Sequence, residues 1–304
     1  MVDMDADWPL PRPINLLEKH RRWVESSLSN TASIASTFSS LATPVVAEAV
    51  RQAQELNTNC DAEGFHQLRV AFRKLRALYW AYSPYLGKEV TAQATEEFKR
   101  LAAVAGATRD WDVAEDLLKA AQVSRASLGL LVAAAREKRA EAVARSQTLI
   151  KSEEIEVFLN DVLDRAQKTL DANGNDLPIS EFARNRVRHA QRTLRKRSRG
   201  ASRDDPVQEE SLHDVRKAGK KLRYLLEFFG PVIKGGYGRT MQELTSMQNK
   251  LGQFNDIAAS ETLIRGTSFN DIPPEVVQES LEWLAKRKCR RMRTASQRVR
   301  AISR

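Results

Sequence analysis

The stretch LHDVRKAGKKLRYLLEFF, residues 212–229, carries far more positive charge than a helix needs for solubility. An earlier stretch, FHQLRVAFRKLRALYWAY at residues 65–82, has nearly the same pattern. A shift of 147 residues aligns His66 with His213, Arg69 with Arg216, Ala71 with Ala218, Lys74 with Lys221, Leu75 with Leu222, Arg76 with Arg223, Leu78 with Leu225 and Pro84 with Pro231. We infer a duplicated helical unit, because self-similarity at a fixed offset is typical of repeated structural units.

The similarity continues beyond these helices. GATRDWDVAEDLL at 106–118 resembles GQFNDIAASETLI at 252–264, with Asp110 and Asp256 in register at a shift of 146. We expect both carboxylates to cap helices that begin just after them, and Asp112 to pair with a nearby arginine. Repeated units tend to pack as a pair about a pseudo-twofold axis, which would bring the two equivalent helices into a shared central region.

The composition predicts an all-α protein. Only 13 Gly and 10 Pro interrupt 304 residues, and long stretches are rich in Ala, Leu, Glu, Lys, Arg and Gln without the alternation typical of strands. The predicted helices are 14–28, 32–56, 64–83, 88–106, 111–121, 124–151, 153–171, 180–199, 210–229, 236–252, 257–266 and 274–302. The clearest breaks are DANGNDLP at 171–178 and GASRDDP at 200–206.

The cations of each repeated stretch share one helical face, called here the basic face. Its members are His66, Arg69, Arg73 and Arg76 in the first copy, and His213, Arg216, Lys220 and Arg223 in the second. Steps of three, four and three residues put all four side chains on one side of an α-helix. Lys74, Lys217 and Lys221 widen this face. The opposite side carries Leu68, Phe72, Leu75 and Tyr79, and Val215, Leu222, Leu226 and Phe229. Each helix should therefore be half core and half cation.

Such a face has an energetic cost that a ligand would offset. Like charges one turn apart destabilise an isolated helix by a few tenths of a kcal/mol per pair, roughly. The planar guanidinium of arginine suits phosphate oxygens, and lysine adds compact charge. The alternative is an ordinary solvated face, which is common for charged helix positions. The recurrence of His-x-x-Arg in both halves favours a binding function.

The whole chain is basic. It has 49 Lys and Arg against 39 Asp and Glu, a net charge of +10 and a pI of about 9.7, which favours an anionic partner. Residues 184–199 contain eight basic residues and residues 286–304 contain nine, both without a carboxylate. Additional candidates for a binding surface in these segments are Arg188, Arg195, Arg290 and Arg293.

At these motifs the chain resembles the CHAD family, whose name stands for conserved histidine α-helical domain. FHQLRVAFRKLR and LHDVRKAGKKLRY resemble the paired motifs of that family, and ATRDWDV and QFNDI resemble the segments that follow them. The resemblance covers residues 30–304, with repeats at about 30–172 and 173–304. Residues 1–29 are expected to form a tail and an extra helix outside it.

The resemblance implies two four-helix bundles in a pseudo-twofold arrangement, with a basic central cavity or pore that binds inorganic polyphosphate. Carried over by position, the implied ligands are His66, Arg69, Arg73, Lys74 and Arg76, and His213, Arg216, Lys217, Lys220, Lys221 and Arg223. The second repeat departs from the first at Asn255, which stands where the first has Arg109, so one basic contact is expected to be lost there.

The residues do not predict an enzyme, a metal site or a cofactor. No phosphate-binding glycine loop, nucleophile elbow or zinc-ligand cluster occurs, and a divalent cation beside so many Arg and Lys is disfavoured. We expect His66 and His213 to donate hydrogen bonds to phosphate, with a helix-packing role as the alternative. Two other functions stay open: a nucleic-acid binder, and an adaptor for acidic proteins. Aromatic residues make up 7% and no nucleic-acid motif occurs, which disfavours the first.

The location predicted for the protein is the cytoplasm, with polyphosphate granules as a more specific site. The first residues, MVDMDADWPLPRP, lack the basic and apolar regions of a secretory signal, and no run of 18 apolar residues occurs. No membrane partner is therefore expected. Cys60 and Cys289 lie far apart without metal-ligand spacing, which suits a reducing compartment.

Overall fold

The computed structural model describes residues 33–58, 62–122, 126–152, 155–173, 177–204, 207–233 and 237–303. Every regular element in these ranges is helical, which confirms the predicted all-α class. The α-helices are α2 (Ile34–Thr58), α3 (Ala62–Gln122), α4 (Gly129–Ser152), α5 (Ile155–Ala172), α6 (Ile179–Arg203), α7 (Glu209–Phe229), α8 (Gly238–Arg265) and α9 (Pro274–Ser303). Short 3-10 turns are η1 (Ala126–Leu128) and η2 (Gly230–Val232). The helix predicted at 14–28 and the boundary predicted after residue 29 lie outside the described residues.

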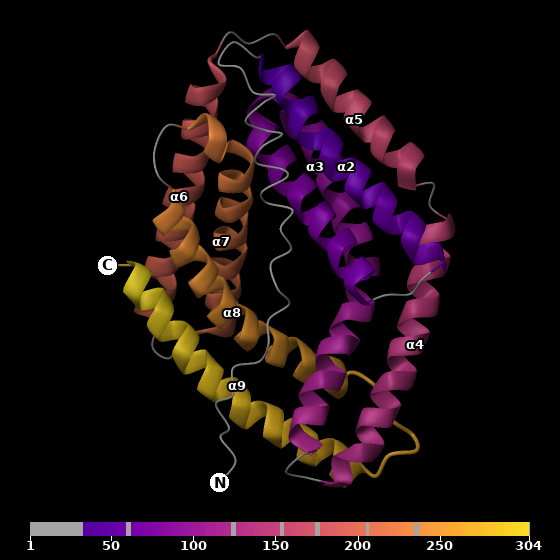
Figure 1. Ribbon diagram of the computed structural model, residues 1–304. Coiled ribbons are helices and arrows are strands. Elements are labelled where there is room, and N and C mark those ends of the chain that lie inside the picture. The colour runs from indigo at the N-terminus through magenta and orange to yellow at the C-terminus, as the bar shows by residue number, and fades with distance from the viewer. Residues whose placement is uncertain are drawn as a thin grey trace.

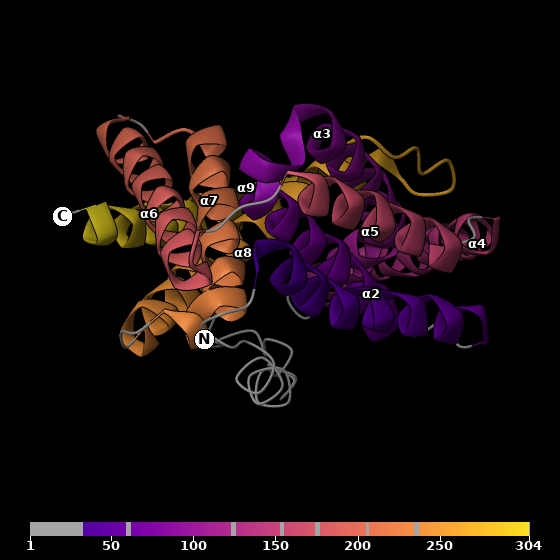
Figure 2. The same ribbon diagram turned by 90° about the horizontal axis from the view of Figure 1, so that it is seen from above.

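The helices form two groups that lie side by side. In Figure 1, α6 and α7 stand on one side and α2, α3 and α5 on the other, while α8 and α9 run across below them toward the lower end of α4. Figure 2 shows the same division from above. The contacts agree with this division, because α2 and α4 pack on α3, whereas α6 packs on α7 and α9.

The longest helix is a hairpin. α3 turns sharply at Gly87, which has φ 76° and ψ 168° and divides the helix into an arm before it and an arm after it. The two arms pack against each other, and the rings of Tyr79 in the first and Phe98 in the second have centroids 5.3 Å apart. Further along the same pair of arms, Arg69 forms an ion pair with Asp110 at 3.0 Å. The hairpin therefore brings the first basic face beside the segment that carries Asp110.

Gly87→Ala is expected to destabilise the protein by about 1–3 kcal/mol, because this φ and ψ combination is almost closed to residues with a Cβ. No atom lies within 4 Å of a Cβ built on Gly87, so the effect would be conformational and not steric. Gly200→Ala is the matched control, since Gly200 lies in α6 with equally open surroundings and the change should stabilise by up to about 1 kcal/mol. Chemical denaturation of both variants measures the difference, and equal effects would contradict this role of Gly87.

Two predicted helix breaks were wrong. α3 continues without a break from residue 88 to 122, and α8 continues through residues 252–257. Asp110 and Asp256 therefore lie inside helices, and the prediction that they are N-caps was also wrong. The physical reason is that an internal glycine costs a helix only about 1 kcal/mol. Burial of Trp111 and Ile257 just beyond the glycines outweighs that cost.

The predicted apolar sides of the two repeated helices are buried. Leu68, Phe72, Leu75 and Tyr79 are at most 1% exposed, and Val215, Leu222, Leu226 and Phe229 at most 4%. They belong to one large core that draws on α2, α3, α5, α6 and α7 together with parts of α4, α8 and α9. A smaller core joins the end of α3 and the start of α4 to α8 and α9. Both cores thus contain residues from both halves of the sequence, which fixes the halves to each other.

Candidate functional site: a cation cluster between α3 and α7

The two basic faces are carried by the first arm of α3 and by α7, and these helices meet near the C-terminal end of each. There the rings of Tyr82 in α3 and Phe229 in α7 have centroids 6.3 Å apart. Nearby, Nζ of Lys74 lies 3.7 Å from Oε2 of Glu227, an ion pair between the helices. The basic faces of α3 and α7 therefore belong to one region of the molecule.

Six predicted ligands form what we call the cation cluster. Its members are Arg69, Arg73 and Arg76 of α3 and Arg216, Lys220 and Arg223 of α7. All six side chains are half-buried. The Nε atoms of Arg76, Arg216 and Arg223 are buried and have no hydrogen-bond acceptor in the described part of the chain. Buried donors normally have acceptors, so these guanidinium groups mark the cluster as a place suited to an anion.

The charged members of the cluster lower one another's pKa values. Burial, followed by the charges of Arg216 and Arg73, lowers the pKa of Lys220 to about 6. Burial and the charge of Arg69 lower the pKa of Arg73 to about 10, with a further contribution from Arg216. Burial is also the main reason why the pKa of Arg216 is lowered, and Arg69 across the interface adds to the effect. These mutual effects cross from α3 to α7, so the two basic faces lie close enough to act on one ligand.

Three carboxylates accompany the six cations without matching their charge. Asp110 accepts a hydrogen bond from Nη1 of Arg69 at 3.0 Å. Glu227 lies 3.5 Å from Nη1 of Arg223 as well as beside Lys74. Asp256 attracts Arg216 and Lys220, while burial raises the pKa of Asp256 itself. The cluster consequently keeps a positive excess.

Gly106 gives Arg69 its place against the second arm of α3. A Cβ on Gly106 would lie 3.0 Å from Cζ of Arg69 and 3.2 Å from its Nε. The missing side chain thus lets the guanidinium pack against the second arm, one turn before Asp110. This glycine, which the sequence suggested as a helix end, instead positions a cation.

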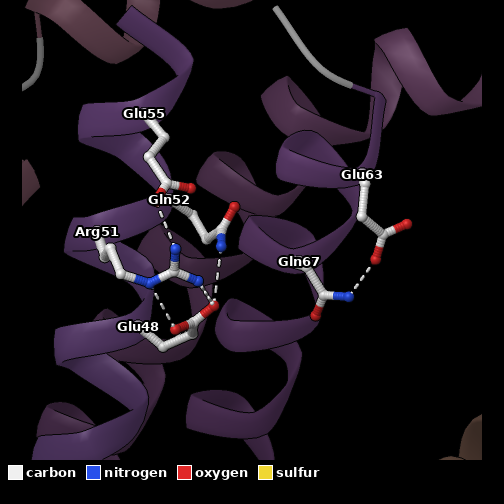
Figure 3. Close-up of polar contacts among 6 residues, drawn as sticks. All are labelled: Glu48, Arg51, Gln52, Glu55, Glu63 and Gln67. Atoms are coloured by element: carbon white, nitrogen blue, oxygen red, sulfur yellow. Dashed lines mark hydrogen bonds and ion pairs between the residues drawn. The ribbon is translucent and has the colours of Figure 1, made fainter. Parts of the chain in front are cut away.

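An arginine elsewhere in the chain shows how different the cluster is. Figure 3 shows Arg51 of α2 held between Glu48 and Glu55, at 2.7 Å and 2.5 Å. Hydrogen bonding to Glu48 is the main cause that raises the pKa of Arg51. In the same view Gln67, which follows His66 in the sequence, donates a hydrogen bond to Glu63. Arg51 has its own carboxylates within one turn, whereas Arg73 and Arg216 have lowered pKa values.

The two predicted histidine ligands have different surroundings. His66 is half-buried, and burial lowers its pKa, with Arg109, Arg73 and Lys220 acting in the same direction. His213 is exposed, and its Nδ1 lies 3.1 Å from Oδ1 of Asn255. Because a carbonyl oxygen only accepts, Nδ1 of His213 carries the proton. The neutral ring therefore has no proton on Nε2, and only the protonated ring could donate from that atom.

Two predicted ligands lie at the margin of the cluster. Lys217 is exposed and pairs at 3.4 Å with Asp214, which also binds Arg197 at 2.7 Å. Nζ of Lys221 lies 4.2 Å from the ring centroid of Trp80, a cation–π contact with α3. Burial lowers the pKa of Lys221 to about 8. These two lysines are thus engaged by other side chains of the protein.

The four additional candidates are exposed, unlike the half-buried members of the cluster. Arg188 and Arg195 of α6 are exposed, as are Arg290 and Arg293 of α9. Arg109, Arg287 and Arg291, which were not among the predicted ligands, line a cavity of about 50 Å³ together with Asp116 and Asp256. Arg109 stands in register with Asn255 beside the repeated aspartate, and Arg287 and Arg291 belong to the basic segment 286–304, but nothing in the sequence brought the three together. The positions of Arg287 and Arg291 depend on how α9 packs on α8.

Nε of Arg139 donates to Asp112 at 2.5 Å, which confirms that Asp112 pairs with an arginine. In the described ranges no group of three or more His, Cys, Asp or Glu could hold a metal ion. Among the described helices, none combines the length and apolar character that crossing a bilayer requires.

Two solved structures are similar to this fold. A crystal structure of the CHAD domain from the plant Ricinus communis covers 90% of this chain and 94% of its own, with a TM-score of 0.75 and 23% identity. PptA from Streptomyces chartreusis covers 88% of this chain and 99% of its own, with a TM-score of 0.65 and 15% identity. At these identities the likeness concerns the fold.

Two curated relatives are the uncharacterized proteins MT2285 and Rv2226 of Mycobacterium tuberculosis, from strains CDC 1551 / Oshkosh and ATCC 25618 / H37Rv. Each is 29% identical over 216 residues, which is 67% of this chain and 40% of the relative. The matching region thus spans less than half the length of these relatives. The model of the CHAD domain family matches residues 41–265, nearly three quarters of the sequence, and it includes both basic faces. The chain therefore belongs to the CHAD domain family.

Proposed function

We propose that this protein binds inorganic polyphosphate at the cation cluster, without catalysing a reaction on it. The supporting observation is the meeting of two basic faces, in which six half-buried cations are accompanied by three carboxylates. A linear polyanion would supply the acceptors that the buried Nε atoms of Arg76, Arg216 and Arg223 lack. Such a ligand would also stabilise the charged form of Lys220, which burial and the charges of Arg216 and Arg73 disfavour.

The proposed architecture is a pair of four-helix units about a pseudo-twofold axis, with the basic faces lining a central cavity or pore. One unit would contain α2, the two arms of α3 and α4, and the other α6 to α9. Reciprocal contacts support this arrangement: Lys74 meets Glu227, and its equivalent Lys221 meets Trp80, which is the equivalent of Glu227. In a twofold pair, a contact from one position to a second is repeated in the opposite direction. The domain would then span residues 30–304, with the units dividing near residue 172.

Binding of long-chain polyphosphate should weaken steeply with salt, because bound phosphates release condensed counterions. Six phosphate contacts correspond to a slope of log affinity against log salt of about −4, taking roughly 0.7 per contact for a flexible single chain. A titration from low to physiological salt by isothermal calorimetry measures this slope. Single-stranded RNA and duplex DNA, added at equal phosphate concentration, serve as competitors. Displacement of polyphosphate by either nucleic acid would favour the nucleic-acid function, and a slope near zero would contradict the proposal.

An adaptor function for acidic proteins would give a different result. Partners captured from a lysate should then stay bound after polyphosphatase treatment, whereas partners held through polyphosphate should be released. The cytoplasmic and granule locations remain predictions. Fluorescence imaging of the tagged protein in cells with and without polyphosphate would test the granule location.

A further inference from the structure

A second basic surface lies on the outer side of α6. It consists of Arg184, Arg188, Arg192, Arg195 and Arg199, and we call it the α6 stripe. These positions fall within an arc of about 80° on an α-helix and extend over about 22 Å. All five side chains are exposed, and within the described ranges none forms an ion pair with a carboxylate. Arg184 donates only to the hydroxyl of Ser180, at 3.4 Å.

Several other exposed arginines of the chain have a carboxylate partner, which the arginines of the α6 stripe lack. Arg197 on the same helix pairs with Asp214 at 2.7 Å. Arg165 of α5 pairs with Asp161 at 2.6 Å, and Arg239 of α8 with Glu243 at 3.2 Å. Five adjacent arginines without such partners repel one another, and a linear polyanion is the ligand that would neutralise them together.

A path of cations joins the α6 stripe to the cation cluster. Cζ of Arg186 lies 4.3 Å from the ring centroid of Trp80, and Nζ of Lys221 lies 4.2 Å from it. The ring of His189, which is one residue from the stripe, has its centroid 5.4 Å from that of Trp80. Besides burial, the charges of Arg186 and of Arg76 in the cluster lower the pKa of Lys221, so both guanidinium groups lie near its amino group. At the outer end, burial and the charges of Arg186 and of Arg192 in the stripe lower the pKa of His189.

We propose that the α6 stripe is a second polyphosphate-binding surface, on which a chain longer than the cation cluster can hold continues past Trp80. This inference rests on the proposed function and adds a preference for long chains to it. The stripe is straight, exposed and unpaired, so it can contact successive phosphates of an extended chain without a fitted pocket. A chain too short to leave the cation cluster would not reach it.

The test compares two triple variants that lose the same charge from different helices. Arg188→Gln/Arg192→Gln/Arg195→Gln removes the centre of the stripe. The matched control, Lys88→Gln/Lys168→Gln/Arg239→Gln, removes three exposed cations of α3, α5 and α8. Each is titrated with long-chain polyphosphate and with tripolyphosphate, and circular dichroism checks that helicity is unchanged.

We expect the α6 variant to bind long-chain polyphosphate about tenfold to a hundredfold more weakly, with a salt slope smaller by about 2. Its affinity for tripolyphosphate should stay within about twofold of the original, and the control variant should lose less than about threefold for either ligand. Equal losses in both variants would mean that only net charge matters and would overturn the inference. So would an α6 variant that keeps long-chain polyphosphate but loses single-stranded RNA. If the unaltered protein bound neither polyphosphate, the proposed function would fail first, and this inference with it.

Discussion

Replacing Arg73 and Lys220 together by methionine is expected to weaken polyphosphate binding strongly while making the unliganded protein more stable. Hydrogen bonds to charged groups contribute about 1.5–3 kcal/mol each, so losing two should reduce affinity at least about a hundredfold. Both residues lie in the cation cluster with lowered pKa values, about 10 for Arg73 and about 6 for Lys220. Methionine has a similar length and avoids the burial of charge that lowers these values.

The gain in stability comes from removing the amino group of Lys220, because its burial costs folding free energy. Its pKa falls from 10.5 to about 6 on folding, so between these values the unfolded chain binds more protons than the folded one. The free energy of unfolding of the original protein should therefore increase with pH from about 6 toward 10.5. At pH 7 the cost of burying the lysine is about 1–3 kcal/mol after allowance for solvent screening. The double variant should gain about that amount and lose this pH dependence.

Denaturant unfolding at pH 7 and pH 9 measures the stability, and calorimetric titration measures the affinity. Lys88→Gln/Lys168→Gln is the matched control, because it removes two exposed cations outside the cluster. The control should change both quantities little. A double variant that lost binding and stability together would indicate unfolding, and one that kept its affinity would contradict the site.

Binding of polyphosphate near pH 7.5 should take up close to one proton for each chain that reaches Lys220. At this pH the Lys220 amino group of the unliganded protein is largely neutral, because its pKa is about 6. The groups that act on it are Arg216 and Arg223 of α7, Arg73 of α3 and the opposing carboxylate Asp256 of α8. A bound polyanion stabilises the charged form and raises this pKa again. Affinity should therefore fall as pH increases above about 6, by up to about tenfold per pH unit.

Calorimetry at one pH in two buffers of different ionisation enthalpy counts the protons directly. Lys220→Arg is the informative comparison, because arginine stays protonated and keeps the charge. This variant should bind with little proton uptake and a flatter pH profile. His66 and His213 also have lowered pKa values, so a His66→Gln/His213→Gln variant measures their share. If Lys220→Arg kept the proton uptake of the original protein, Lys220 would not be the group responsible.

The sequence predicted the helices that have an apolar side and failed where a glycine interrupts one. α7 and α9 begin and end within one residue of the predicted limits. The apolar spacing of α7 runs between two breaks that contain Gly and Pro, and α9 begins directly after Pro273. The breaks predicted after Gly106 and Gly252 do not exist. Local helix preference made these glycines unfavourable, but the packing of both sides of α3 and α8 outweighed it.

The residue types of the site could be predicted, and their partners could not. Spacing alone put Arg69 and Arg73 on one face of their helix, as it did Arg216 and Lys220. Nothing in the sequence indicated that Asp110 would bind Arg69 from the returning arm of α3. The contact of Lys221 with Trp80 was equally unforeseen, because it joins residues 141 positions apart.

By itself the sequence determined the helical class, the duplicated basic face and the apolar side opposite to it, since these follow from residue type and the period of a single helix. Only the tertiary structure decided which cations come together, which of them have carboxylate partners and how far each pKa moves. The physical reason is that electrostatic energy depends on distance and burial across helices. These are fixed by how α3, α7 and α8 pack, and no spacing within one helix contains that information.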